Sequence, residues 1–269
     1  MIGLVDADFI KYLVAYDIER MYKKGLKPNI LIPYATVAAL TQDRVNNVFK
    51  DVESITNTLI FLFSGRTRDN VRNKIATYKQ YKGTRKYAQK YDNEEEYKSW
   101  VEEYIKDNYE YHKEDELEAD DLCTMAHIRG KTFIYSKDKD LRNSPGFHFD
   151  FTTKSLVTVD DFEGLISLLK QAITGDSVDN IPGANNVGPV AAKKALKEAK
   201  TSLEAIVATI ELFLNQPGSD KNNFDRFIEM YSLVNLRTSE GDWIKEKYKD
   251  YFTKINKLIS NDEGECNLI

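Results

Sequence analysis

Three short apolar runs, separated by long stretches of helical periodicity, most constrain what this chain can fold into. The runs cover residues 2–6, 58–63 and 131–135, and each is rich in β-branched or aromatic residues. Such runs indicate buried strands, and residues 147–151 indicate a fourth. Strands that alternate with helices form a mainly parallel sheet with helices on its faces, so the sequence predicts an α/β fold.

The intervening segments carry helical patterns. Apolar residues recur at helical spacing over 9–22 and 37–52, and residues 92–117 keep an aromatic stripe at Tyr97, Trp100 and Tyr104. A helix is expected to start at Glu118 and to end at Gly130, and another to start after Asp160. Further helices are predicted over 190–200 and, three of them, over 202–261, before a frayed tail at 260–269.

Length and composition bound the class of protein. A chain of 269 residues, 42% of them hydrophobic, supports one large domain or a core with a smaller appendage. No signal peptide and no run of about 20 apolar residues is present, so no membrane partner is expected. Two cysteines form neither a disulfide framework nor a zinc motif, which favours a reducing cytoplasm. The net charge of −5 says nothing about a local basic patch.

Acidic residues gather where strands end or helices begin. Eight stand at such positions: Asp6, Glu118, Asp120, Asp121, Asp138, Asp140, Asp176 and Asp179. The carboxyl ends of parallel strands meet at one edge of a sheet, which is where open α/β sheets place their sites. Asp6 as a cap of the following helix is the alternative interpretation at that position.

The segment Glu118–Asp121 is the densest of these groups, with three carboxylates in four residues. One helix cap and one dipole partner would use two of them. Three so close together repel each other unless a cation lies among them. A solvated acidic helix start is the alternative, because residues 91–121 are acid-rich throughout.

Carboxylates without histidine or cysteine select hard cations. Only three histidines exist, and the one near an acidic motif, His127, is expected on the far side of its helix. Mg²⁺ or Mn²⁺ are therefore the expected ions. Eight carboxylates exceed the needs of one ion, and two ions about 3.5–4 Å apart suit in-line hydrolysis of a phosphodiester.

A basic segment supplies the complementary partner. Residues 66–90 contain nine Lys or Arg and one acid, with Tyr78, Tyr81 and Tyr87 interleaved and Tyr91 just after. Cations for phosphates and flat rings for unstacked bases are the composition of a single-strand-binding surface. The alternative is a solvated charged segment.

A turn over residues 175–189 joins two acids to Pro182, Gly183 and Gly188. Backbone amides at such a turn and helix start can bind phosphate or a monovalent cation. A plain connection between two helices is equally compatible with this pattern.

In order and spacing, five motifs over roughly residues 1–200 resemble the 5′-nuclease (flap endonuclease) family. The similarity is greatest to the bacteriophage 5′–3′ exonucleases and the nuclease domain of bacterial DNA polymerase I. The motifs are Asp6, residues 81–85 (Tyr-Lys-Gly-Thr-Arg), 118–121 (Glu-Ala-Asp-Asp), 136–140 (Ser-Lys-Asp-Lys-Asp) and 175–182 (Gly-Asp-Ser-Val-Asp-Asn-Ile-Pro). The resemblance implies a PIN-like core over 1–174 with a helical arch or clamp at 66–113, followed at 175–269 by a helical part with a helix–three-turn–helix module.

The resemblance also implies residue roles. Asp6, Glu118, Asp120, Asp121 and Asp138 would bind one ion, and Asp140, Asp176 and Asp179 would serve the second. Lys82 and Arg85 would steer the scissile phosphate, with Arg72 nearby and Tyr81 available for stacking. Duplex DNA would be held by Gly183, Asn186, Val187, Gly188, Lys193 and Lys194, with K⁺ as a further ligand of the module. The implied partner is DNA with a 5′ flap or 5′ end, or an RNA–DNA hybrid, bound by a monomer in the cytoplasm of a bacterium or a phage-infected cell.

Two positions depart from the family pattern. The second strand ends in Ser64-Gly65, where the family usually has an aspartate, and Asp69 is the nearest acid that follows. Asn186 stands where the hairpin usually has a glycine. Because asparagine tolerates left-handed backbone better than most residues, the turn is expected to survive.

Two rival classes remain at this stage. A haloacid-dehalogenase-type phosphatase has similar acidic signatures, but its last motif should follow a strand, and residues 162–174 are helical in pattern. A non-catalytic DNA-binding relative is the second rival, because of the missing acid at the second strand. The sequence does not decide between flap, exonuclease and primer-removal activity, nor between a closed arch and an open groove.

Overall fold

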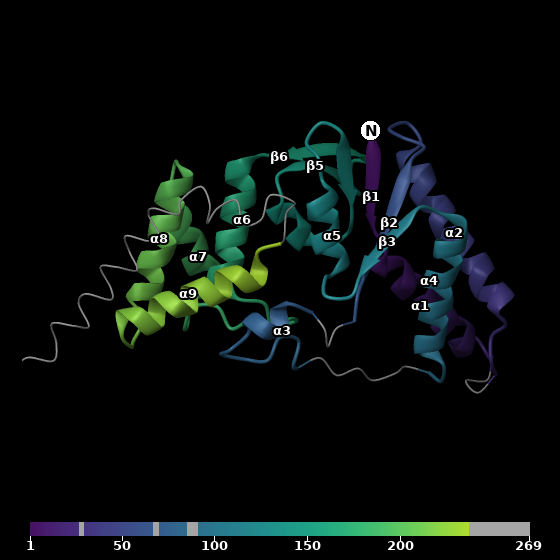
Figure 1. Ribbon diagram of the computed structural model, residues 1–269, viewed down its shortest axis with the longest axis horizontal. Coiled ribbons are helices and arrows are strands. Elements are labelled where there is room, and N and C mark those ends of the chain that lie inside the picture. The colour runs from purple at the N-terminus through teal and green to yellow at the C-terminus, as the bar shows by residue number, and fades with distance from the viewer. Residues whose placement is uncertain (27–29, 67–69, 85–90, 237–269) are drawn as a thin grey trace, which may run out of the picture. The chain divides into compact units, whose positions relative to one another are not determined.

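The computed structural model describes residues 1–26, 30–66, 70–84 and 91–236, which form two compact units (Figure 1). The first unit contains the sheet and comprises Met1–Asn70, Lys86–Leu141 and Gly146–Val159. The second is helical and comprises Val71–Arg85, Arg142–Pro145 and Asp160–Ile269. The predicted functional division at residues 174 and 175 is not tested by these units. α6 (Asp161–Thr174), which that division places in the core, belongs to the helical unit.

The sheet unit is built on six strands in the order β3-β2-β1-β4-β5-β6. Neighbouring strands from β3 to β5 run parallel, and β6 pairs antiparallel with β5. The strands are β1 (Ile2–Asp6), β2 (Leu59–Ser64), β3 (Tyr111–Glu114), β4 (Thr132–Tyr135), β5 (Gly146–Asp150) and β6 (Ser155–Val159). The predicted α/β fold with a mainly parallel sheet is confirmed.

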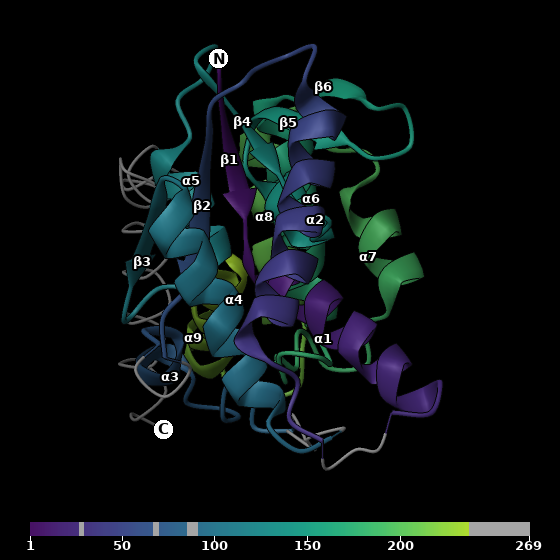
Figure 2. The same cartoon turned by 90° about the vertical axis from the view of Figure 1, so that its right-hand side faces the viewer.

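Helices cover both faces of this sheet. Figure 1 shows α5 (Ala119–Ala126) on one face and α1 (Asp8–Lys23), α2 (Tyr34–Val52) and α4 (Glu94–Asn108) on the other, and in Figure 2 these three helices lie in front of the sheet. Side chains alternate accordingly, because successive residues of a strand point to opposite faces. Val5, Phe61 and Phe133 pack in the core beneath α1, α2 and α4.

Two strands, β3 and β6, were not predicted from the sequence. Residues 92–117 were expected to form one amphipathic helix, but α4 ends at Asn108 and β3 follows it. The aromatic stripe itself is confirmed, since Tyr97 is buried and Trp100 and Tyr104 pack against the same core. α5 ends at Ala126 rather than at Gly130, since the Thr132 hydroxyl accepts the Ile128 amide at 2.8 Å just beyond the helix end.

The helical unit has a core of its own. It comprises α3 (Arg72–Ile75), α6, α7 (Pro189–Leu196), α8 (Ser202–Leu214) and α9 (Asp220–Val234). Asp160 caps α6 as predicted, through its side chain and the Glu163 amide at 2.7 Å. Phe213, Phe227 and Tyr231 are buried between these helices. The third helix expected within 202–261 and the tail at 260–269 lie outside the described residues.

In the described part of the chain, no helix is both long enough and apolar enough to span a bilayer.

Candidate active site

Strand register brings the polar side chains of Asp6 and Ser136 to one edge of the sheet. Asp6, the last residue of β1, is level with Leu62 of β2, and Val5 is level with Tyr135 of β4. The chain therefore leaves β4 at Ser136 directly beside Asp6. The carboxyl ends of these parallel strands are the place where the sequence predicted a site.

Asp6 is held in a polar, largely buried position. Its Oδ2 accepts a hydrogen bond from the Ser136 hydroxyl at 2.8 Å, and its Oδ1 accepts one from the Asp8 amide at 3.3 Å. Burial, followed by the negative charge of Asp8 and more weakly that of Asp138, raises the pKa of Asp6 to about 7. The Ser136 hydrogen bond acts in the opposite direction. Asp6 does not cap α1 with its side chain, because the cap position belongs to Ala7.

The Glu118–Asp121 segment begins α5, as predicted. Glu118 and Asp121 form a reciprocal capping box, in which the Glu118 amide donates to Asp121 Oδ2 at 3.3 Å. Asp120 accepts the Asp121 amide at 2.7 Å. The interpretation as a solvated acidic helix start fails for Asp121, which is completely buried.

The buried thiol of Cys123 shows that acids from different segments converge. Its pKa is raised well above the usual range, first by burial and then by the charges of Asp6, Asp120, Asp8 and Asp121. The strand end and the helix start therefore face one small region of the sheet unit.

The segment after β4 differs from the expectation. Asp138 and Asp140 were placed on one side of an extended chain, but residues Lys139–Asn143 form a 3₁₀ turn. Asp138 Oδ1 accepts the Asp140 amide at 2.8 Å and so caps that turn. The spacing argument is therefore wrong here, although Asp138 remains close enough to Asp6 to affect its pKa.

Ser64 has a structural partner at the position where the resemblance expects an aspartate. Its hydroxyl accepts the Ala119 amide at 2.9 Å and so ties the end of β2 to the start of α5. A side chain at Gly65 would place a Cβ 2.1 Å from the Glu114 carbonyl oxygen, so that position requires glycine. Asp69, the suggested substitute, lies outside the described residues.

Sequence reasoning missed Asp8 and Lys11. The Lys11 ammonium lies 2.8 Å from Asp8 Oδ1 and 3.3 Å from Glu102 Oε2. It also lies 4.7 Å from the centre of the Phe63 ring. This lysine is a fixed positive charge among the acids. The Asp6-Ala7-Asp8 motif could have indicated Asp8, but the sequence analysis gave a site role to Asp6 alone.

The remaining predicted acids belong to the helical unit. Asp176 Oδ1 accepts the amides of Val178 at 2.7 Å and Asp179 at 3.2 Å. Asp179 accepts the Tyr81 hydroxyl at 3.0 Å, and its carbonyl oxygen accepts the Lys82 amide at 2.8 Å. Residues 81–82 are thus fastened to the 176–181 turn inside this unit.

Two of the predicted substrate contacts do not fit this geometry. Tyr81 is only 4% exposed, so its ring is not available for stacking on a base. Arg72 is equally buried, and its Nε donates to the Leu233 carbonyl at 2.9 Å. Lys82 is partly exposed, with its ammonium 5.0 Å from the Tyr81 ring centre. Arg85 lies outside the described residues.

The predicted duplex-binding turn forms as expected in its backbone. Gly183 and Asn186 have φ values of +66° and +58°, so asparagine does adopt the left-handed conformation in place of glycine. Gly188 is the N-cap of α7, while Lys193 and Lys194 lie exposed on that helix and Val187 is partly buried. The Gly183 carbonyl already accepts Arg226 Nε at 3.1 Å and Nη2 at 2.6 Å, and the K⁺ that the resemblance implies for this module stays a prediction.

The donor chemistry of the sheet unit suits a hard divalent cation, because its acids and Ser136 offer carboxylate and hydroxyl oxygen. Within the described ranges, however, no three His, Cys, Asp or Glu side chains are arranged closely enough to chelate an ion. A bound cation would therefore have to draw these carboxylates together. The set of eight that includes Asp176 and Asp179 stays a prediction.

The fold of this chain is similar, along nearly its whole length, to the folds of solved phage 5′-nucleases. Bacteriophage T5 5′-exonuclease with bound zinc is similar at a TM-score of 0.60 and 21% identity, covering 97% of this chain and 98% of that one. The T5 flap endonuclease in complex with DNA and metal ions is similar at a TM-score of 0.56 and 20% identity, with the same coverage. No protein-family model matches, and no curated protein matches significantly. These similarities establish the fold.

Proposed function

We propose that this protein is a divalent-metal-dependent, structure-specific 5′-nuclease that hydrolyses phosphodiester bonds near 5′ ends of DNA. Two independent observations support the proposal. The fold resembles that of phage 5′-nucleases over 97% of the chain. Residues at the carboxyl ends of β1 and β4 and at the start of α5 supply carboxylates of the kind that such chemistry requires.

The observation that carries the proposal is the environment of Asp6. A carboxylate that is buried beside Asp8 and Asp138 is unfavourable in its ionised form, and its raised pKa expresses that cost. Bound divalent cations would offset the repulsion. An acidic cluster retained at such a cost is typical of functional sites, although structural networks also perturb pKa values.

In this proposal the residues divide into binding roles. Asp6, Glu118, Asp120, Asp121 and Asp138 hold one Mg²⁺ or Mn²⁺ ion, and Asp140, Asp176 and Asp179 hold a second. When bound, such ions activate water and stabilise the charge on the leaving oxygen. Lys82 holds the scissile phosphate. The turn at 183–188 and Lys193 and Lys194 hold the duplex backbone, because exposed cations and a helix start attract phosphate.

The proposed partner is DNA with a 5′ flap or 5′ end, or an RNA–DNA hybrid, bound by a monomeric protein. The T5 flap endonuclease of the same fold was crystallised with DNA and metal ions, which supports a DNA partner. The proposed location is the cytoplasm of a bacterium or a phage-infected cell.

The haloacid-dehalogenase-type phosphatase is not favoured. Its last acidic motif should follow a strand, whereas Asp176 follows the helix α6. The non-catalytic relative remains the outcome to exclude by experiment.

A labelled 5′-flap duplex incubated with Mg²⁺ tests the proposal directly, with EDTA and p-nitrophenyl phosphate as comparison reactions. Metal-dependent release of short 5′ products, with no turnover of p-nitrophenyl phosphate, is expected. Binding of the flap duplex without cleavage under Mg²⁺ or Mn²⁺ would identify a non-catalytic relative. Turnover of the small ester alone would identify a phosphatase.

A further inference from the structure

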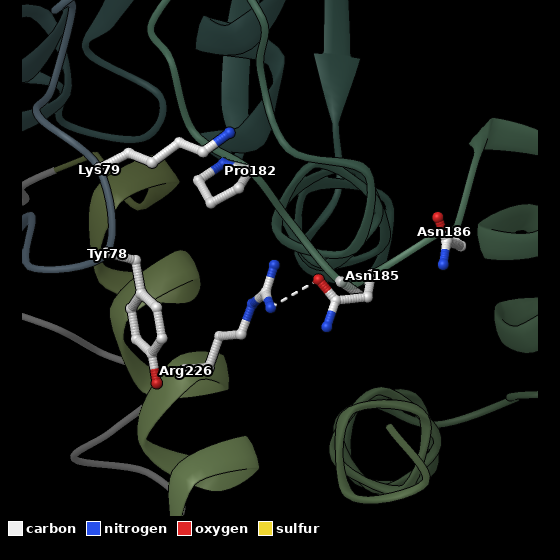
Figure 3. Close-up of a pocket in the computed structure, with 7 residues that line it drawn as sticks. Tyr78, Lys79, Pro182, Asn185, Asn186 and Arg226 are labelled. Carbon is white, nitrogen blue, oxygen red and sulfur yellow. Dashed lines mark hydrogen bonds between the residues drawn. The ribbon is translucent and has the colours of Figure 1, made fainter. Parts of the chain in front are cut away.

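A cavity of about 340 Å³ lies within the helical unit (Figure 3). Its wall comes from three segments: Tyr78 and Lys79, the turn 182–186, and Arg226 of α9. An aromatic ring, two cations and two side-chain amides therefore surround one space. The turn also belongs to the proposed duplex contact, whereas Tyr78, Lys79 and Arg226 have no role in the proposed reaction.

Tyr78 is fixed in place although its side chain is 46% exposed. Its backbone amide donates to Glu229 Oε1 at 3.0 Å, and its hydroxyl donates to the Asn222 carbonyl at 3.1 Å. The Thr77 amide, at 2.9 Å, donates to the same carboxylate oxygen. Both ends of the residue are thus anchored to α9. An exposed ring that is already immobilised loses little entropy on binding a ligand.

Arg226 forms the wall that faces this ring. Its guanidinium lies 5.6 Å from the centre of the Tyr78 ring. Its Nη1 donates to Asn185 Oδ1 at 2.7 Å, as Figure 3 shows, while Nε and Nη2 donate to the Gly183 carbonyl. Three of the five guanidinium N–H groups make these contacts. The positive charge is therefore held rigidly at the cavity. The other two N–H groups of the guanidinium take no part in these three contacts.

The charged residues that line the cavity are the cations Lys79 and Arg226, whereas the two acids near Tyr78, Glu229 and Asp225, are not part of its wall. Glu229 is engaged by the Thr77 and Tyr78 amides. Asp225, next to Arg226, lies 2.9 Å from the ammonium of Lys221. Lys79 is exposed and, in Figure 3, extends towards Pro182 on the same side of the cavity. The cavity consequently presents a net positive wall beside an aromatic face.

We propose that this cavity binds one nucleotide of a single-stranded DNA segment, with the base against Tyr78 and the phosphate between Lys79 and Arg226. The inference rests on the proposed function, and it deepens it by naming a contact for the unpaired part of the substrate. An immobilised ring suits an unstacked base of any sequence, and the cations suit its phosphate. A volume of about 340 Å³ is at the lower end for ligand sites, which fits one nucleotide and excludes a duplex.

Binding of a short 5′-phosphorylated single strand, measured by fluorescence anisotropy in EDTA, tests this inference without cleavage. Tyr78→Leu should weaken binding at least about fivefold, because the stacking surface is lost. Tyr78→Phe should retain binding, because the ring remains. Lys79→Gln should reduce the slope of log K against log salt by about 0.7, the value for one phosphate contact on a single strand. Lys170→Gln removes an exposed cation of the same unit that does not line the cavity, and it should reproduce the unaltered protein's affinity after correction for net charge.

Two results would overturn the inference. One is unaltered affinity in Tyr78→Leu, with a melting temperature that shows an intact fold. The other is complete displacement of the strand by millimolar inorganic phosphate, which would make the cavity a simple anion site. The nuclease proposal is tested separately by flap cleavage. If the protein does not cleave but binds single strands through Tyr78, the nuclease proposal fails and the inference about the cavity stands. If the protein cleaves but Tyr78→Leu and Lys79→Gln bind as the unaltered protein does, the inference about the cavity fails and the nuclease proposal stands.

Discussion

The hydroxyl of Ser136 lies 2.8 Å from Oδ2 of Asp6 and donates a hydrogen bond to it. This contact joins the ends of β4 and β1. It lowers the pKa of Asp6, but burial and two neighbouring acids outweigh it and the net pKa is raised to about 7. The ionisation of Asp6 therefore reports on the candidate metal centre in a way that can be measured.

Stability of the metal-free protein should fall as pH rises from about 4 to 7. In this window the unfolded chain has already released the Asp6 proton, since its unfolded pKa is near 3.8, whereas the folded protein still holds it. Each pH unit then costs up to ~1.4 kcal/mol of unfolding free energy from this group. Urea denaturation in EDTA between pH 4 and 8 measures the slope, and Asp6→Asn should flatten it.

Mg²⁺ should reverse this trend, because the ion binds the ionised carboxylate and releases its proton. The gain in melting temperature on adding Mg²⁺ should accordingly be larger at pH 8 than at pH 5. Ser136→Ala should raise the pH midpoint of that gain. An Mg²⁺ effect that is the same at both pH values, in the native protein and in Asp6→Asn alike, would contradict the assigned role.

Asp121→Ala should reduce the rate of flap-duplex cleavage by about 10³-fold or more and leave the affinity for DNA unchanged. Asp121 is completely buried at the start of α5, near the same thiol as Asp6 and Asp120. Loss of its capping contact should also cost about 1 kcal/mol of stability. Asp121→Asn keeps the size of the side chain, so a folded but inactive Asn variant separates the chemical role from the cap.

The control for this experiment is Asp107→Ala, which removes an exposed acid from the end of α4. It should leave cleavage unchanged. Undiminished turnover in Asp121→Ala would remove this residue from the metal centre.

Lys82→Ala should slow the chemical step about 10²-fold while changing duplex affinity much less. The Lys82 amide donates to the Asp179 carbonyl at 2.8 Å, and its φ of +54° is a conformation that few side-chain-bearing residues adopt. Alanine keeps the Cβ and the amide, so the substitution removes only the charge and its stem. Single-turnover cleavage and equilibrium binding of the same substrate separate the two effects, with Lys82→Arg as the charge-preserving control. A variant that loses affinity but cleaves bound substrate at the normal rate would show that Lys82 only binds.

The sequence predicted most of the sheet because its central strands are short apolar runs that no helix pattern resembles. The edge strands β3 and β6 lack that signal, since a strand with one neighbour need not be apolar on both faces. In β3, partly buried Tyr111 and Lys113 alternate with exposed His112 and Glu114, directly after an acid-rich helix.

The candidate acids could be identified from their positions after strands, but the arrangement of their side chains could not be predicted from the sequence. Asp138 caps a turn instead of lying along an extended chain. The tyrosines of the basic segment were interpreted as a binding surface, yet Tyr81 and Tyr91 are buried. Their partners, Asp179 and the Ala15 carbonyl, lie 98 and 76 residues away, and such contacts cannot be derived from local composition. Among the described tyrosines of that segment, Tyr78 alone keeps an exposed ring, and it lines the cavity in the helical unit.

Duplex binding should not depend on K⁺ at the Gly183 carbonyl, one oxygen of the module to which the resemblance assigns the ion. The Gly183 carbonyl accepts two N–H groups of Arg226, and a carbonyl oxygen has two lone pairs, so none remains for a monovalent cation. The guanidinium supplies the positive charge at this turn instead. Affinity for a nicked or flapped duplex, measured at equal ionic strength in KCl and NaCl, should agree within about twofold, because the general salt effect is the same for both.

Arg226→Gln is the decisive variant for this claim. It removes the charge and exposes the Gly183 carbonyl, while the left-handed backbone at Gly183 and Asn186 is retained by the residues themselves. If K⁺ then occupies the exposed carbonyl, the variant should bind duplex more tightly in KCl than in NaCl. If the turn instead loses its order, the variant should bind duplex more weakly in both salts. A several-fold preference for K⁺ in the unaltered protein would show that Arg226 leaves the carbonyl when DNA binds, and that the cation takes its place.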